Sequence, residues 1–500
     1  MAERRKQKEQ PEDQEGIRHL SKLRNGDLNP KMANKDISIG KSLKRLKKFL
    51  FPIKLHINLI FFLSIISLIN CQRKLRSNSS FITLRLNHSS YFLNASFLPL
   101  PDQVYIDDTP QERSKWEGKF INITSMYQVI KLEWNDKLIN TSAMFSNLIQ
   151  IIEVDLSNFD SSLVIDTSYM FKGCDFLGSI NFNGFTTSSV KTMRAMFYWM
   201  GTITSIDVSH FDTSQVTDMG LLFNRIGRLT SIDVSNFNTS SVTNMEGMFG
   251  DSAFLFLNLS NFDTRKVQTM QNMLCYCHQL TSVVLSSFDT SSCGNFLYMF
   301  SHSESIKSLN LSHFDTSKAG HLVGMFLYCE SLEFLDISNF KTGQMISFWD
   351  MFNRCKSLTS INLGSFDTTR ISNINHMFKD CYSLRSLDLS MFKTPRLATM
   401  YETFANCNSL TSIILSNLDT TKVENMESTF YNCNSLTSLN ISHFKTSNVK
   451  TMKNIFYNCA TLTSLDILNF DTTKVTDMTS MFEKCTGLVK LDISNFYPNN

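Results

Sequence analysis

Proline and glycine are scarce in this chain, with 8 and 18 residues respectively among 500. Collagen-like and low-complexity disordered sequences are rich in both, so these classes are excluded for most of the chain. An excess of charge of one sign is also missing, because 48 Lys and Arg face 45 Asp and Glu and leave a formal net charge of +3. Proteins that bind nucleic acid normally carry a clear basic excess, so DNA and RNA are not expected partners. The 12 cysteines are too few for a small disulfide-stabilised scaffold.

Sequence motifs of the common catalytic sites are absent as well. The sequence contains no H-E-x-x-H, G-x-S-x-G or G-x-G-x-x-G, which would indicate a zinc protease, a hydrolase nucleophile or a dinucleotide site. We therefore expect a protein that is not an enzyme, with no catalytic residue, no cofactor and no resident metal ion.

The N-terminal part divides into three regions of different composition. Residues 1–46 mix acidic and basic side chains with few apolar ones, and we expect a disordered extension there. Residues 47–72 contain an uncharged run from Leu55 to Cys71, preceded by basic residues, which is typical of a signal peptide or a signal anchor. The basic flank predicts a cytoplasmic N-terminus, so everything after about residue 72 is expected outside the membrane. Residues 73–129 are predicted to form an N-terminal capping region for the array that follows.

Two features leave the processing of this segment open. The tetrapeptide Leu68-Ile69-Asn70-Cys71 has the outline of a bacterial lipoprotein cleavage box, in which Cys71 would carry the lipid, although Asn70 departs from the small residue expected there. A cleaved signal peptide and a retained anchor are the alternatives. Met32 is a second candidate for the start of the chain.

Residues 130–500 are one repeat, which is visible in two columns of aromatic residues. Successive members of each column lie 26 residues apart, with a single step of 25. The first column is Phe159, Phe185, Phe211, Phe237, Phe262, Phe288, Phe314, Phe340, Phe366, Phe392, Leu418, Phe444, Phe470 and Phe496. The second is Phe145, Phe171, Phe197, Phe223, Phe249, Leu274, Phe300, Phe326, Phe352, Phe378, Phe404, Phe430, Phe456 and Phe482.

The unit at residues 229–249 shows how each repeat is expected to fold. Ile232 and Val234 alternate with polar residues, which predicts a short strand. Val242, Met245, Met248 and Phe249 then recur at helical spacing, which predicts a helix of about two turns capped by Thr239 or Ser240. Because neither apolar stripe can be buried within one unit, the units must stack. The sequence therefore predicts an α/β solenoid, leucine-rich-repeat-like, of about fourteen strand-turn-helix units with a stacked parallel sheet.

The repeated pattern L-T-S-L-D-[LIV]-S-N-F-D-T-[ST]-x-V-T-x-M-x-x-M-F-x-x-C resembles a known family. It is similar to the BspA-like leucine-rich-repeat surface proteins, in the branch first noticed in mycoplasma lipoproteins. The resemblance covers about three quarters of the chain. It implies an extracellular, surface-attached solenoid that takes part in adhesion or in binding host proteins, and it implies no catalysis.

Nine cysteines occupy one position of the repeat, three residues after the second aromatic column. They form a predicted ladder of Cys174, Cys277, Cys329, Cys355, Cys381, Cys407, Cys433, Cys459 and Cys485. Stacked disulfides are one interpretation, because adjacent rungs lie within disulfide range. Other units place Leu148, Met200, Ile226, Ser252 or Ser303 there, so we favour buried free thiols that form a core ladder. Cys275 and Cys293 lie off the ladder, and a bond between them stays open.

A polar column follows the strand and is the candidate binding face. Its members are Asp155, Asn181, Asp207, Asp233, Asn258, Asn310, Asp336, Asn362, Asp388, Asn440, Asp466 and Asp492. The adjacent pairs Asp207 with Asp233 and Asp466 with Asp492 suggest calcium. The 6 to 8 oxygen ligands that calcium prefers are not visible, so a solvated polar face is the preferred interpretation.

These patterns together predict a cell-surface or secreted repeat protein that mediates adhesion or protein binding through the polar strand face. The expected partner is an extracellular protein or host-matrix ligand, with the membrane reached through residues 55–71 or a lipid anchor. A structural spacer of the same fold is one alternative, and an enzyme with its site in residues 73–129 is another. Because the last unit, Leu488–Phe496, ends without a helix, we expect either that this end docks against a partner or a second copy, or that the chain is a piece of a longer array.

The basic cluster before Leu59 and the uncharged run after it predict that residues 73–500 are exposed outside the cell. Added protease should therefore digest the repeats on intact cells. The measurement is a time course of proteolysis on intact and lysed cells, followed with an antibody against the repeats. Repeats that are protected on intact cells and digested only after lysis would show that this topology is wrong.

Overall fold

The computed structural model describes residues 80–125 and 127–497 of the chain. The charged extension, the membrane-targeting segment and Cys71 lie outside these residues. The chain divides into two compact units, Met1–Asn78 and Ser79–Asn500, and only the second falls in the described part. No helix in the described ranges is both long enough and apolar enough to cross a membrane.

An antiparallel sheet begins the second unit. It consists of β1 (Ser80–Leu86), β3 (Gln103–Ile106), β4 (Thr109–Pro110) and β6 (Gln128–Trp134), in the order β4-β3-β6-β1. β7 (Ile151–Asp155) pairs antiparallel with the other edge of β1, and β8 (Ser179–Asn181) continues the sheet in parallel. The sheet of the repeats therefore has no free edge at its start, because β1 covers it.

Smaller elements complete this region. β2 (Ser90–Tyr91) pairs with β5 (Phe120–Ile121), and η1 (Arg113–Lys115) is a single turn of 3-10 helix. Trp116 and Trp134 are among the largest fully or almost fully buried side chains here. The region thus has a hydrophobic core of its own that is continuous with the core of the repeats.

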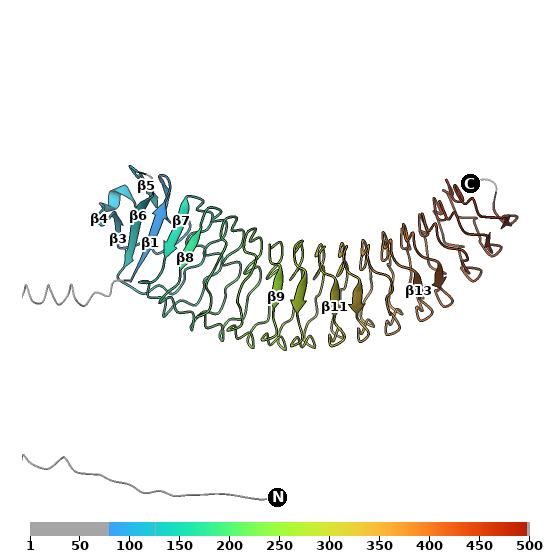
Figure 1. Cartoon of the computed structure of the whole chain (residues 1–500), viewed down its shortest axis with the longest axis horizontal. Helices are drawn as coiled ribbons and strands as arrows, with labels where there is room; N and C mark the ends of the chain where they lie inside the picture. The colour runs from blue at the N-terminus through green and yellow to red at the C-terminus, as the bar shows by residue number, and fades with distance from the viewer. Residues whose placement is uncertain (1–79, 126, 498–500) are drawn as a thin grey trace, which may run out of the picture. The chain divides into compact units, whose positions relative to one another are not determined.

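The remaining chain forms a β-solenoid of about 13 turns, in which short parallel strands stack (Figure 1). Most coils contribute one strand of two or three residues, and strands of consecutive coils pair in register. These strands are β9 (Phe256–Asn258), β10 (Ser282–Val284), β11 (Ser308–Asn310), β12 (Phe334–Asp336), β13 (Ser386–Asp388), β14 (Ser412–Ile414), β15 (Ser464–Leu465) and β16 (Lys490–Leu491). The predicted solenoid with stacked parallel strands is confirmed.

The predicted helix in each unit is wrong, because the described residues contain no α-helix. In the unit at 229–249, backbone N–H groups alternate between two kinds of partner. Those of Met245, Gly247 and Phe249 donate to carbonyls of the next coil at 2.8–3.1 Å. Those of Met248 and Gly250 donate back three residues within their own coil. The α/β class is therefore corrected to an all-β solenoid.

Left-handed backbone recurs at two positions of every coil and explains why no helix forms. In the same unit Gly247 has φ of 56° and Asp251 has φ of 50°. A positive φ interrupts a right-handed helix and instead fits the third residue of a type II turn. Met245, Met248 and Phe249 are nevertheless all fully buried. Successive turns of three residues bury the same positions as a helix would. The spacing of the apolar residues therefore could not distinguish consecutive turns from a helix.

Both aromatic columns lie in the core, where rings of neighbouring coils pack against each other. In the second column the ring centroids of Phe326 and Phe352 are 5.7 Å apart with planes at 2°, and those of Phe352 and Phe378 are 5.4 Å apart. In the first column Phe288 and Phe314 are stacked at 6.3 Å. Offset stacking of this kind adds to the free energy gained by burying the rings.

The left-handed positions predict different effects for two alanine-to-glycine substitutions. Ala195 and Ala405 are both buried, but only Ala195 has a positive φ, of 53°. Ala195→Gly should relieve backbone strain of about 1–2 kcal/mol, which offsets the flexibility that glycine adds to the unfolded chain. Ala405→Gly should lower the free energy of unfolding by about 0.5–1 kcal/mol. Urea unfolding of the two variants measures the difference, and equal destabilisation by both would contradict the assignment.

Candidate binding surface

The predicted Asp/Asn column lies at the end of each strand, where the chain leaves the strand face. In all twelve members the side-chain Oδ1 accepts the backbone N–H of the residue two positions later, at 2.8–3.4 Å. This is the Asx turn, in which the side chain bends its own backbone. The column thus forms one corner of the coil, and one oxygen of each side chain is already engaged.

The same hydrogen bonds stabilise the charged form of two carboxylates of this column, Asp207 and Asp233. The hydroxyl and the backbone N–H of Ser209 and Ser235 lower the pKa of Asp207 and Asp233. Within the described ranges, no three His, Cys, Asp or Glu side chains gather closely enough to hold a metal ion. The recurrent spacing Asp-x-Ser is the sequence signal of an Asx turn, and it could have shown the structural role of the column.

The strand face presents mostly Ser and Thr, and it is interrupted by a few large apolar side chains. Phe256 begins β9 and is 49% exposed, and Phe334 begins β12 and is 56% exposed. Ser282 and Ser308 occupy the same register position on the two strands between them. Leu255, which directly precedes β9, and Ile414, which ends β14 six coils further along, are also exposed. We call Leu255, Phe256, Phe334 and Ile414 the strand-face patch, which the sequence analysis did not single out.

A column of buried threonines joins each coil to the next and was also missed. Thr316 is representative: its hydroxyl donates to the carbonyl of Lys341 at 2.9 Å and accepts the backbone N–H of Lys341 at 2.8 Å. The predicted helix cap Thr239 makes the same pair of bonds to Asp263 instead. The sequence signal is the repeated Thr, in most coils after Asp, Asn or Lys, at a position that the structure buries almost completely. Column members include Thr187, Thr213, Thr239, Thr264, Thr290, Thr316, Thr342, Thr368, Thr394, Thr420, Thr446 and Thr472.

The cysteine ladder lies in the core beside the second aromatic column. Each thiol donates to the carbonyl of the aromatic-column residue in the preceding coil, for example Cys355 to Phe326 at 3.2 Å. Ser303 makes the equivalent bond to Leu274 with its hydroxyl at 2.7 Å. The described cysteines, Cys275 and Cys293 included, are free, and Cys485 alone is partly exposed. Burial raises the pKa of Cys174, Cys277 and Cys433 to about 12.

The left-handed positions carry side chains that pack from coil to coil along the opposite turn. Tyr276 and His302 are stacked at 4.4 Å, and His302 and Tyr328 at 4.2 Å. The guanidinium carbon of Arg354 lies 4.6 Å from the centre of the Tyr328 ring, and its Nε lies 3.2 Å from Asp380. These side chains cover the turn. The ring faces of His302 and Tyr328 already contact other side chains of the protein.

A charged cluster lies on the same turn. The imidazole of His376 lies between two acids, with Nδ1 3.1 Å from Asp350 and Nε2 3.3 Å from Glu402. Lys379 also pairs with Glu402. Although burial alone would lower the pKa of His376, the neighbouring carboxylates of Asp350 and Glu402 raise it to about 9. These partners come from three consecutive coils, so the charged imidazolium links the coils.

The described part of the capping region, residues 80–125 and 127–129, contains one buried lysine that could be considered for an enzyme site. Lys119 is buried there, and burial lowers its pKa. Its Nζ donates to the carbonyls of Asn94, Ala95 and Phe97 at 3.1, 2.6 and 2.6 Å. All three donors of the ammonium group are therefore occupied by a loop, which is the arrangement of a structural lysine.

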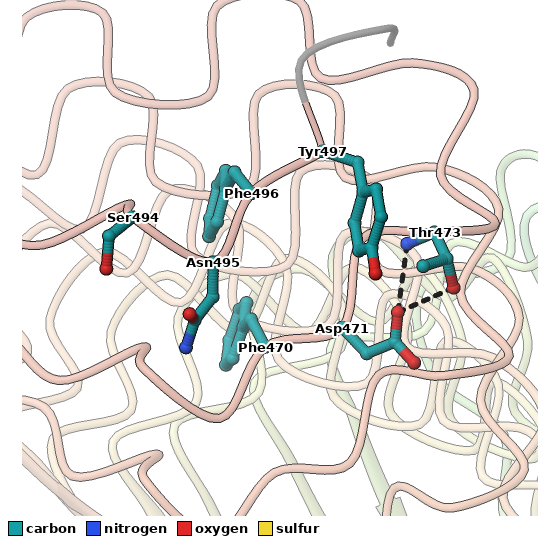
Figure 2. Close-up of a pocket in the computed structure, with 7 residues that line it drawn as sticks. All are labelled: Phe470, Asp471, Thr473, Ser494, Asn495, Phe496 and Tyr497. Atoms are coloured by element: carbon teal, nitrogen blue, oxygen red, sulfur yellow. Dashed lines mark hydrogen bonds between the residues drawn. The ribbon is translucent and has the colours of Figure 1, made fainter.

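A hollow lies at the last described coils, between residues that the next coil would cover elsewhere in the array (Figure 2). It is lined by Phe470, Asp471 and Thr473 of one coil and by residues 494–497 of the last. Asp471 accepts hydrogen bonds from the backbone and hydroxyl of Thr473, as at the same corner of other coils. The hollow is lined by the same kind of turn as in other coils, and its side chains are of types that also occur elsewhere in the array.

The coils and their surfaces define a β-solenoid repeat protein. The chain belongs to the family described as "Mycoplasma protein of unknown function, DUF285", which matches residues 114–224, 200–309, 251–359, 295–414 and 398–500. This agrees with the mycoplasma-type repeat that the resemblance implied. The narrower BspA-like assignment stays a prediction.

Among solved structures, the chain is similar to the functional domain of InlJ from Listeria monocytogenes, which is described as including a cysteine ladder. The two are 15% identical over 75% of this chain and 68% of that one, with a TM-score of 0.19. No curated protein matches the chain.

The buried position of the cysteines predicts that they are reduced and slow to react. Alkylation of the native protein should modify few of them, and alkylation after denaturation should modify all the ladder residues. Mass spectrometry of the two samples measures this. Disulfides joining neighbouring rungs between Cys329 and Cys485 would contradict it.

The histidine cluster predicts a pH dependence of stability. A raised pKa means that the contribution of His376 is fully present below about pH 6.5 and is lost as the pH rises through about 9. The free energy of unfolding should fall by about 1–2 kcal/mol over this range, after allowance for solvent screening. His376→Gln should remove this part of the slope. Urea titrations from pH 6 to 9.5 compare the two proteins, and parallel curves would contradict the role of His376.

Proposed function

We propose that this protein is held at the cell surface and binds another macromolecule through the strand face of its solenoid, in adhesion or attachment. The expected partner is an extracellular or host-matrix protein. The proposal rests on the strand-face patch, since large apolar side chains are exposed there without any role in the core.

The repeat itself shows that these side chains are not needed for folding. Where the strand-face patch has Phe256 and Phe334, most other coils have Ser. Each Phe lies on a strand whose next residue, Leu257 or Leu335, fills the core. Phe is among the residues that are enriched in protein interfaces relative to the rest of the surface.

Rigidity supports the same function. Three consecutive coil steps separate Phe256 from Phe334, or about 14 Å at the spacing of paired strands. Hydrogen bonds between all the intervening coils fix this distance, for example from Leu274 to Met299 at 2.9 Å and from Phe300 to Met325 at 3.0 Å. A partner that contacts both rings therefore meets a preformed surface, and little conformational entropy is lost on binding.

The proposal predicts that the two phenylalanines dominate binding. Phe256→Ser with Phe334→Ser places the residue of other coils at both positions, so the fold should be kept. Loss of two interface aromatics should weaken binding at least about tenfold. The full chain, purified in mild detergent, is titrated against host cells and a panel of immobilised matrix proteins.

Met391→Asn is the matched control, because Met391 is 56% exposed and lies at a turn where several other coils have Asn. It should bind as the wild-type protein does. A double serine variant that retains full affinity would move the binding surface away from the strand face. A wild-type protein that binds none of these targets would favour the spacer.

A further inference from the structure

We propose that one edge of the solenoid is a second binding surface, which takes a linear sulfated or carboxylated polysaccharide. This edge is the corner after the first aromatic column, and it is formed by two adjacent columns of side chains. The proposal is independent of the strand face, because the two surfaces share no residue.

The first column alternates in charge from coil to coil. Asp315 is followed by Lys341, Asp367 and Lys393, and the alternation continues to Asp471. Lys341 lies 3.5 Å from Asp315, so in this pair of neighbouring coils opposite charges face each other. Hydrogen bonds from the backbone and hydroxyl of Ser317 and Thr369 lower the pKa of Asp315 and Asp367, which keeps both ionised. From Asp315 to Asp471 this column has four Asp and three Lys, so its charges nearly cancel.

The second column, three residues later, is not balanced. It carries Lys318, Arg370, Arg396, Lys422 and Lys474, all exposed, and no acid in this span. Arg370, Arg396 and Lys422 lie on three consecutive coils, about 5 Å apart at strand spacing. Like charges at that separation repel each other. Among the described residues, Lys318, Arg396 and Lys422 have no ion-pair or hydrogen-bond partner for their charged groups.

The fold does not require these charges. Other coils place Ser189, Gln215, Ser241, Ser292 or Asn448 at the same position of the repeat. The backbone beneath is nevertheless fixed, since Thr368 accepts the N–H of Lys393 at 2.9 Å and Thr420 accepts that of Lys445 at 2.8 Å. Arg370 donates to Gln344 at 2.7 Å and Lys474 donates to Asn448 at 2.8 Å, and both acceptors are neutral. The positive charge of the row is therefore available to an external anion.

The spacing of the row indicates the chemistry of that anion. Cations stand one or two coils apart in a single line, with the carboxylates of the first column beside them. A polysaccharide carries its charges at intervals of whole sugar units, so it can pair with the cations and avoid the carboxylates. Duplex DNA carries a phosphate charge about every 1.7 Å, which would meet those carboxylates. Single-stranded nucleic acid needs aromatic side chains for stacking, and neither column has one between Lys318 and Lys474.

The test uses the full chain in mild detergent and heparin as the probe. Arg370→Gln, Arg396→Ser and Lys422→Gln are combined, since each introduced residue already occurs at this position in other coils. Binding to heparin should weaken roughly tenfold, with a shallower dependence of affinity on salt. A control with three other cations replaced, Lys115→Gln, Lys172→Ser and Lys453→Gln, should bind heparin as the wild-type protein does.

Three outcomes would overturn the proposal. The first is equal heparin affinity of the triple variant and the wild-type protein. The second is an equal loss in the control, which would reflect net charge alone. The third is binding of duplex DNA, or of phosphatidylserine vesicles, as tight as heparin and through the same three residues. Phe256→Ser with Phe334→Ser should leave heparin binding unchanged, so failure of this proposal and failure of the strand-face proposal can be told apart.

Discussion

The structure depends on hydrogen bonds between the backbones of consecutive coils. A coil of 26 residues is too short to bury its apolar side chains or to pair its backbone by itself. Each coil instead donates to the next, as Met245, Gly247 and Phe249 do at 2.8–3.1 Å. Every other backbone N–H along the turn is used in this way, so the chain cannot form a helix there and must alternate turns with bonds to the neighbouring coil. The stacking of the aromatic columns follows, because equivalent residues are brought into register.

This constraint explains which features the sequence alone could predict. The exact period of the phenylalanines required equivalent residues to be neighbours, and the alternation around Ile232 and Val234 required a strand, so the solenoid and its parallel strands could be predicted. The helix could not be excluded, because consecutive turns bury Met245, Met248 and Phe249 at the same spacing as a helix. The left-handed positions could not be predicted from residue type, because Asp251, Tyr276 and Arg354 adopt this backbone as well as Gly247. Their strain is tolerated because the bonds between coils determine the backbone.

The candidate site was predicted less well, for a related reason. In a repeat, the most regular polar positions are those that build the coil, and the Asp/Asn column is regular because it forms Asx turns. Residues of a candidate binding surface are better recognised where they differ from the repeat. Phe256 and Phe334 do so, because most other coils have Ser at this register position. The same reasoning separates the two charged columns on the edge. The alternating column places opposite charges on neighbouring coils. Arg370, Arg396 and Lys422, in contrast, occupy a position at which other coils of the same fold have neutral residues.

The alternating column also bears on how a chain of near-identical coils finds one structure. Neighbouring units are so alike that leaving one coil out of the stack would still match aromatic with aromatic and threonine with threonine. It would, however, bring Asp315 against Asp367, or Lys341 against Lys393, at about the spacing of paired strands. Like charges directly opposite each other are destabilising, and opposite charges stabilise the correct neighbour. Charge alternation therefore favours the correct neighbour over a skipped coil, in the half of the array where the cysteine ladder is also unbroken.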